Sequence, residues 1–123
     1  MFITTTRRSF FQLVQELDFK IIKDPYWRSL MYIVSGNETL FANRHSLINY
    51  KEREINSEVW FTGSFSGGEQ RLLQLAFNLF TNLPYYLTEG DQKEYISPLE
   101  IFAGLDDYHY RLAKNALDVR LRV

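Results

Sequence analysis

The sequence predicts a mostly α-helical fold, a single compact domain of four to five helices. Apolar residues recur at intervals of three and four over most of the chain, and Ser, Asp, Pro and Gly stand where helices begin and end. The 123 residues are 46% hydrophobic and 16% aromatic, which requires one core and leaves no room for a second domain. Residues 48–62 allow a small two-stranded β ribbon as well. We therefore expect residues 1–123 to form one helical domain.

Residues 6–22 carry the first helical pattern, an apolar stripe on one face. Its members are Phe10, Leu13, Val14, Leu17 and Ile21. A second helix is expected to start after Asp24, an N-cap residue, with Pro25 at its first position. Its apolar face comprises Trp27, Leu30, Met31 and Val34. We expect Gly36 to end this helix as a left-handed C-cap.

The middle of the chain, residues 37–64, has a weaker pattern. Leu40 and Phe41 indicate a short helical turn, and residues 48–50 and 59–61 are the candidate strands of the ribbon. The charged run at residues 51–54 between them is expected to face solvent.

The strongest helix is expected from Ser66 to a stop at Pro84. Its apolar positions are Leu72, Leu75, Ala76, Leu79, Phe80 and Leu83. Residues 85–95 are interpreted as a polar, tyrosine-rich loop. Ser97 and Glu100 form a predicted capping box with Pro98 between them, opening a short helix that ends at Gly104. Asp106 is expected to cap the last helix, with Leu105, Tyr108, Leu112, Ala116 and Val119 facing inward.

Charge and composition exclude several classes of function. Lys plus Arg is 14 and Asp plus Glu is 15, so the chain lacks the basic excess of a general nucleic-acid binder. The absence of cysteine excludes disulfides, thiol nucleophiles and thiolate metal sites. No apolar run is long enough for a membrane helix, and the first residues do not resemble a signal peptide. We therefore expect a cytoplasmic protein without membrane association.

One motif invites a functional interpretation. Ser66-Gly67-Gly68-Glu69-Gln70-Arg71 is similar to the signature sequence of ABC-type ATPases, in which a helix start contacts a nucleotide phosphate. No phosphate-binding loop of the Gly-x-x-x-x-Gly-Lys type accompanies it. A structural interpretation is simpler, because Ser66 and Glu69 have the spacing of a capping box. An anion or partner site involving Ser66, Gly67, Gly68 and Arg71 stays open.

The remaining candidate residues give no catalytic pattern. His45 and His109 have no neighbour at metal-ligand spacing, and helix capping accounts for Asp106 and Asp107. No metal, cofactor or catalytic residue is predicted. The tyrosines at 85, 86, 95, 108 and 110 are candidates for a cluster at one end of the domain, where Tyr85, Tyr86 and Tyr110 would contact a partner.

Three blocks of sequence resemble a family of small uncharacterised proteins from phages and prophages of Gram-positive bacteria. They are residues 28–37, residues 66–80, which are the most specific, and residues 105–120. The resemblance implies an origin in a mobile element and life inside a bacterial host. It implies no activity and no catalytic residues.

These observations favour a non-catalytic interaction protein that binds a host or phage protein. One concrete version is an inhibitor of a host defence system such as a CRISPR nuclease. The alternative is a nucleic-acid or nucleotide-binding module that uses the helix start at Ser66-Gly67-Gly68. The sequence leaves a homodimer open.

Overall fold

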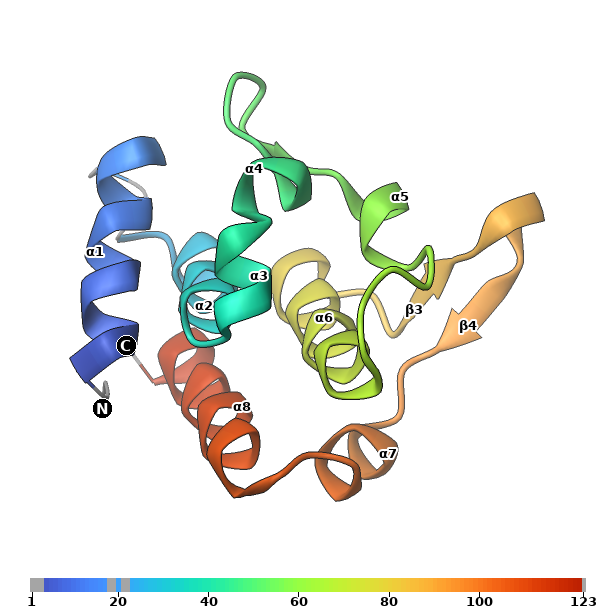
Figure 1. Cartoon of the computed structure of the whole chain (residues 1–123). Coiled ribbons are helices and arrows are strands. Elements are labelled where there is room, and N and C mark those ends of the chain that lie inside the picture. Colours follow the sequence, from blue (N-terminus) through green and yellow to red (C-terminus); the bar gives the residue numbers. More distant parts are fainter. Residues whose placement is uncertain (1–3, 18–19, 21–22, 123) are drawn as a thin grey trace.

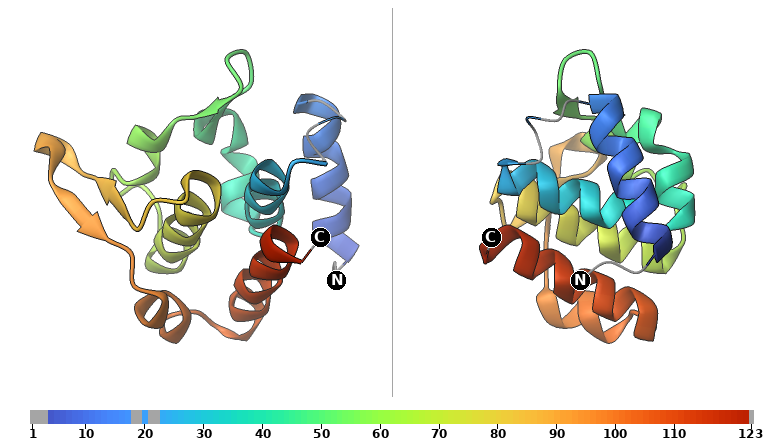
Figure 2. Two further views of the ribbon diagram at one scale, coloured as in Figure 1. Left: turned by 180° about the vertical axis from the view of Figure 1, so that it is seen from behind. Right: turned by 90° about the vertical axis from the view of Figure 1, so that its left-hand side faces the viewer.

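A buried helix, α2 (Pro25–Ser35), runs through the middle of the molecule and contacts α1 (Thr4–Leu17), α6 (Gly67–Thr81) and α8 (Asp107–Leu121). The computed structural model describes residues 4–17, 20 and 23–122. Every side chain of α2 from Ser29 to Ser35 is buried. This helix is therefore the centre of the core, and the other long helices surround it (Figures 1 and 2).

Shorter elements fill the space between the long helices. The short helices are α3 (Glu38–Ala42), α4 (Arg44–Leu47), α5 (Ser57–Trp60), α7 (Pro98–Ala103) and the 3₁₀ turn η2 (Glu89–Asp91). Strands β1 (Ile48–Asn49) and β2 (Glu54–Ile55) form one antiparallel pair, and β3 (Tyr85–Leu87) and β4 (Lys93–Tyr95) form another. The predicted mostly helical fold is confirmed, with eight α-helices in the described part of the chain. None of these helices has both the length and the apolar character needed to cross a membrane.

The predicted stripe of the first helix is confirmed at Phe10, Leu13, Val14 and Leu17, which are all buried. The structure describes this helix from Thr4 to Leu17, and most of the predicted continuation to residue 22 lies outside the described residues. Ile21, the last predicted member of the stripe, lies outside the described residues.

The two ends of α2 are fixed in different ways, the first by a local cap and the second by packing against α8. The Asp24 side chain accepts a hydrogen bond from the Tyr26 N–H, so the predicted N-cap is confirmed. The prediction for Gly36 is wrong in conformation, because its φ of −87° is right-handed. Glycine is needed there for packing instead, since a Cβ at Gly36 would lie 2.2 Å from Leu112 Cδ1. The close approach of α8 to α2 therefore leaves no room for a side chain at residue 36 unless Leu112 moves.

The middle of the chain is only partly as predicted. Helix α3 contains the expected turn at Leu40, and β1 lies where the first strand was expected. The second strand is wrong: Val59 and Trp60 belong to α5, and β1 pairs instead with Glu54 and Ile55. Trp60 is fully buried, and its indole Nε1–H donates to the Leu47 carbonyl at 2.9 Å. This tertiary contact overrides the strand propensity of an aromatic pair.

The segment after α6 also differs from the prediction. The helix ends at Thr81, and Asn82 closes it in the left-handed conformation, two residues before Pro84. Leu83 therefore lies outside the helix and is 40% exposed instead of buried. Residues 85–95 are not a loop but the β3–β4 hairpin, which projects from the body of the molecule (Figure 1).

The last two helices are close to the prediction. Ser97 caps α7 by accepting from the Glu100 N–H, with Pro98 at the first position, and Asp106 caps α8 in the same way through the His109 N–H. Of the residues expected to face inward from α8, Leu112 and Ala116 are buried, and Leu105, Tyr108 and Val119 are half-buried. Helix α8 thus covers one side of α2.

Candidate functional site

A groove of about 790 Å³ lies between α5 and β3. Residues of α5, of the segment before β3, of β3 itself and of η2 line it, whereas β4 does not. Strand β3 is thus the side of the hairpin that faces the groove, and β4 lies on the outside (Figure 1). Grooves with an apolar floor and polar edges are the usual form of a binding site.

The floor of the groove is aromatic. The rings of Phe61 and Tyr86 stack with their centres 3.9 Å apart and their planes at 16°. Phe77 of α6 contacts the Phe61 ring edge to face at 5.8 Å. Burial raises the pKa of the Tyr86 hydroxyl, and the nearby Glu94 carboxylate adds to this effect. The floor therefore joins the hairpin to the core through a stack of rings.

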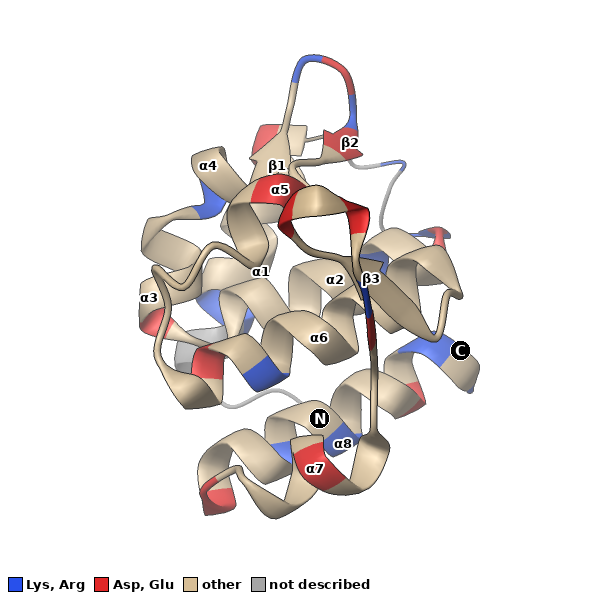
Figure 3. Cartoon of the chain, turned by 90° about the vertical axis from the view of Figure 1, so that its right-hand side faces the viewer, with Lys and Arg blue, Asp and Glu red and all other residues tan. Residues whose placement is uncertain are grey.

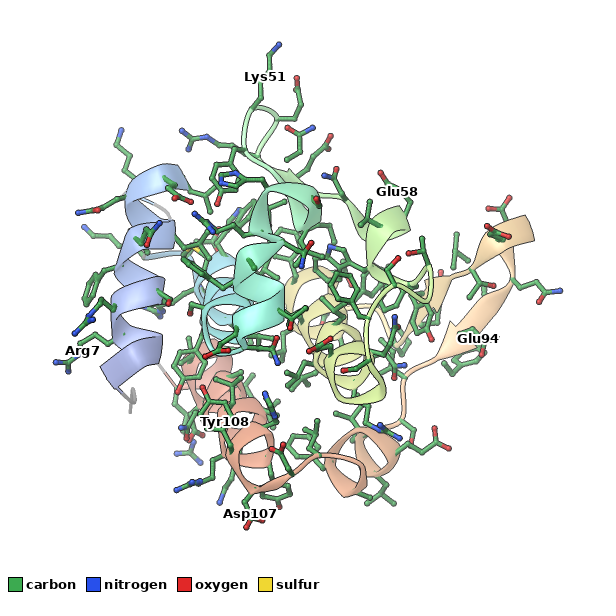
Figure 4. All side chains as sticks on the ribbon, viewed as in Figure 1. Arg7, Lys51, Glu58, Glu94, Asp107 and Tyr108 are labelled. Carbon is green, nitrogen blue, oxygen red and sulfur yellow. The ribbon has the colours of Figure 1, made fainter. Side chains whose placement is uncertain are left out.

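The rim of the groove is acidic. Glu58, Glu89 and Asp91 line it, and among the described lining residues there is no Lys or Arg. Figure 3 shows the acidic positions of α5 and of the turn between β3 and β4 on the same side of the molecule. Figure 4 shows Glu58 on α5 and Glu94 on β4, both extending away from the core. Since the whole chain has a net charge of only −1, this acidity is a local property.

The two faces of the hairpin differ. Tyr85 lies opposite Tyr95, Tyr86 opposite Glu94, and Leu87 opposite Lys93. Because side chains alternate along a strand, Tyr86 and Glu94 share the face that stacks on Phe61. The other face carries Tyr85, Leu87, Lys93 and Tyr95. Leu87 is 51% exposed and Tyr95 69% exposed, so this second face presents apolar surface to solvent.

Sequence reasoning missed this hairpin and hence the groove. The signal was present: two runs rich in aromatic and apolar residues flank Glu89-Gly90-Asp91, and Gly90 has the positive φ, 78°, that a tight turn needs. The contributions of Glu58 and Phe61 carried no comparable signal, since they depend on how α5 packs.

The Ser66-Gly67-Gly68 helix start forms a complete capping box. Ser66 Oγ accepts from the Glu69 N–H at 3.3 Å, and the Glu69 carboxylate accepts from the Ser66 N–H at 3.1 Å. The structural interpretation is confirmed in its geometry. The box occupies two of the N–H groups that an anion would need, and it places a negative charge beside them.

The other sequence candidates do not gather at one place. Arg71 lies against α7, where a Cβ at Gly104 would meet the Arg71 guanidinium within 2.0 Å. Tyr110 on α8 contacts Phe102 of α7 edge to face at 5.4 Å. Tyr85, Tyr86 and Tyr95 belong to the hairpin, whereas Tyr108 and Tyr110 belong to α8. The expected tyrosine cluster is thus divided between two parts of the molecule.

A second polar arrangement surrounds His109. Its Nδ1 lies 2.9 Å from Asp106 Oδ1, and its Nε2 lies 3.0 Å from Asn37 Nδ2. Asn37 Oδ1 accepts from the Leu40 N–H, so the amide nitrogen donates to Nε2 and the proton of the neutral ring is on Nδ1. Hydrogen bonds from His109, first from its backbone N–H, hold the pKa of Asp106 below its usual value.

Both imidazole nitrogens of His109 are therefore occupied, Nδ1 by Asp106 at the start of α8 and Nε2 by Asn37 at the start of α3. Neither nitrogen is available to a metal or a substrate without breaking this arrangement. In the residues that the structure describes, no three His, Asp or Glu side chains are grouped as metal ligands.

Comparison with known proteins gives one finding. A family model with the description "Family of unknown function (DUF6075)" matches residues 1–122. No curated protein and no solved structure matches the chain. Since the match extends over almost the whole sequence, the chain belongs to the DUF6075 family of unknown function.

Proposed function

We propose that this chain is a non-catalytic protein of a mobile genetic element that acts by binding another protein. The observation that carries the proposal is the groove between α5 and β3, with its aromatic floor and the exposed apolar residues beside it. Leu83 and Leu87, which both line the groove, are 40% and 51% exposed. Apolar surface that gathers in this way, next to a polar rim, is typical of a protein interaction site.

The mobile-element origin is supported by the three sequence blocks at residues 28–37, 66–80 and 105–120. In that setting, a small binding protein that inhibits a host defence system, such as a CRISPR nuclease, is the concrete form of the proposal. The competing function is binding of a nucleic acid or nucleotide at the α6 start. The capping box argues for a structural role of that helix start.

The test is a tagged capture from bacterial lysate with and without nuclease, using variants matched in chemistry. Leu87→Glu places a charge beside the groove, and Leu99→Glu places the same charge on α7, where the leucine is 83% exposed. Both substitutions are on the surface and should leave the fold intact.

We expect a stoichiometric protein partner that survives nuclease, is retained by Leu99→Glu and is lost with Leu87→Glu. Partners that disappear with nuclease, or capture that both variants retain equally, would contradict the proposed surface. In the first case the nucleic-acid alternative gains support, and a salt-dependent shift with DNA or RNA would establish it.

A further inference from the structure

Strand β3 has a free edge that opens into the groove. The Thr88 N–H donates to the Gln92 carbonyl at 2.9 Å, and the Ile96 N–H donates to the Pro84 carbonyl at 2.9 Å. In an antiparallel ladder, the hydrogen-bonded pairs alternate with pairs whose backbone groups point outward. Tyr86, between these two pairs, therefore bonds to β4, and the N–H and C=O groups of Tyr85 and Leu87 point away from it.

The outward direction at β3 is the direction of the groove. Tyr85, Leu87 and Thr88 line the groove, whereas no residue of β4 does. A third strand laid along β3 would lie between the hairpin and α5. Its side chains on one face would meet the Phe61 and Tyr86 rings.

We infer that an extended segment of a partner protein, with alternating apolar and basic residues, pairs with the free edge of β3 in this groove. An unpaired strand edge is a template for strand addition, in which main-chain hydrogen bonds supply affinity and side-chain pockets supply specificity. The aromatic floor fits apolar side chains of the segment. The carboxylates of Glu58, Glu89 and Asp91 fit its Lys or Arg side chains.

This inference rests on the proposed function and names how the partner binds. The probe is a synthetic peptide of about ten residues, blocked at both ends, that alternates valine with lysine. Two control peptides accompany it. In one, glutamate replaces lysine, and in the other, every second peptide nitrogen is methylated so that one edge loses its donors.

Two proline variants test the strand edge directly. Leu87→Pro removes an N–H from the free edge of β3, and Lys93→Pro removes the equivalent N–H from the outer edge of β4. Neither N–H bonds within the hairpin, and proline is tolerated at such edges. Both variants remove one outward-facing N–H, on opposite edges of one element. Lys93→Pro also removes a positive charge, which should not weaken the binding of a cationic peptide.

We expect calorimetry to show that the affinity for the valine–lysine peptide falls about tenfold or more in Leu87→Pro. The affinity should not fall in Lys93→Pro. Both control peptides should bind weakly. Salt should reduce the affinity of the valine–lysine peptide. By NMR, hydrogen exchange of the Leu87 amide should slow on peptide binding, while that of Lys93 should not.

Three results would overturn the inference: equal affinity of the two proline variants, preference for the glutamate peptide, or no protection of Leu87 at about millimolar peptide. Concentration-dependent dimers abolished by Leu87→Pro would also overturn it, in favour of pairing between two copies. If the partner from lysate is still lost with Leu87→Glu while these tests fail, the proposed function stands and strand addition is wrong.

Discussion

Glu16 of α1 is held from two sides by residues far along the chain. Arg44 donates to its two carboxylate oxygens at 2.9 and 3.0 Å, and the Tyr50 hydroxyl donates at 2.8 Å. The Arg44 hydrogen bond, chiefly, lowers the pKa of Glu16 from 4.5 to about 2. The bidentate pair with Arg44 ties α1 to α4, and the Tyr50 hydrogen bond ties α1 to the turn between β1 and β2.

The depressed pKa predicts a pH-dependent contribution to stability. The unfolded state binds a proton to Glu16 near its ordinary pKa of 4.5, whereas the folded state resists protonation until about pH 2. The contribution is thus complete above about pH 5 and is lost as the pH falls through the folded pKa. Glu16→Gln should cost about 1–2 kcal/mol near neutral pH, since solvent screens part of the pair.

Urea unfolding of both proteins at about pH 7 and about pH 2.5 checks this prediction, because the difference should shrink at the lower pH. Glu52→Gln, in the exposed turn between β1 and β2, is the control and should change nothing. A difference that stays constant with pH would contradict the role of the Glu16 charge.

Gly36 gives a second prediction at the scale of one residue. Gly36→Ala should destabilise the protein by about 1–3 kcal/mol, because its Cβ would overlap Leu112. Gly68→Ala should be neutral or stabilising by up to about 1 kcal/mol, since nothing lies within 4 Å of a Cβ there. Denaturant melts compare the two. The cost of Gly36→Ala should fall when Leu112→Ala provides space, and an unchanged cost would show that packing against Leu112 is not the cause.

The elements that depend on local chemistry were predictable. The stripe in α1, the caps at Asp24, Ser97 and Asp106, and the capping box of α6 follow from side chains within a few residues of one another. The position of α5 does not, because Trp60 is placed by a hydrogen bond to Leu47 in another element. The conformation of Gly36 was also unpredictable, since α8 imposes the need for glycine.

The candidate site also has parts that the sequence predicts and parts that it does not. Tyr85 and Tyr86 were predicted to contact a partner because tyrosine is enriched at protein interfaces, and both line the groove. Their hairpin was mistaken for a loop, although Gly90 marked its turn. Phe61 and Glu58 come from a segment predicted to be a strand or left unassigned, so the groove itself is a product of tertiary packing.

The capping box of α6 makes a prediction at the scale of one element. Ser66→Ala should cost about 1 kcal/mol, because the Glu69 N–H loses its acceptor at the helix start. Ser46→Ala, at an exposed position inside α4, should cost less than about 0.5 kcal/mol. Thermal and urea melts measure both. If Ser66→Ala leaves stability unchanged but removes binding of a nucleotide, the helix start is a ligand site and not only a cap.

At the scale of the whole molecule, one core joins the long helices and the groove. The central helix α2 contacts α1, α6 and α8, and Phe77 of α6 connects that core to the Phe61–Tyr86 stack. A molecule built around one shared core unfolds as a unit when it is this small.

Two tryptophans report on different parts of this core. Trp27 of α2 packs against Phe80 at 4.8 Å, and Trp60 of α5 is buried near Phe77. Trp60→Phe leaves Trp27 as the reporter, and Trp27→Phe leaves Trp60. We expect the fluorescence and far-UV circular dichroism midpoints to coincide within each variant, with Trp60→Phe destabilised by about 1–3 kcal/mol through its lost hydrogen bond. Midpoints that differ would mean that the groove region unfolds separately from the helical core.

The central place of α2 also has a consequence for biosynthesis. The ribosome synthesises α2 early, as residues 25–35. One of its main neighbours, α8, is synthesised much later, as residues 107–121. At about 5–20 residues per second, several seconds separate the two on the ribosome. For that interval the apolar surface that α8 will cover stays open to water and to chaperones. Native packing of this protein is therefore completed after translation of α8, whatever order the earlier helices take.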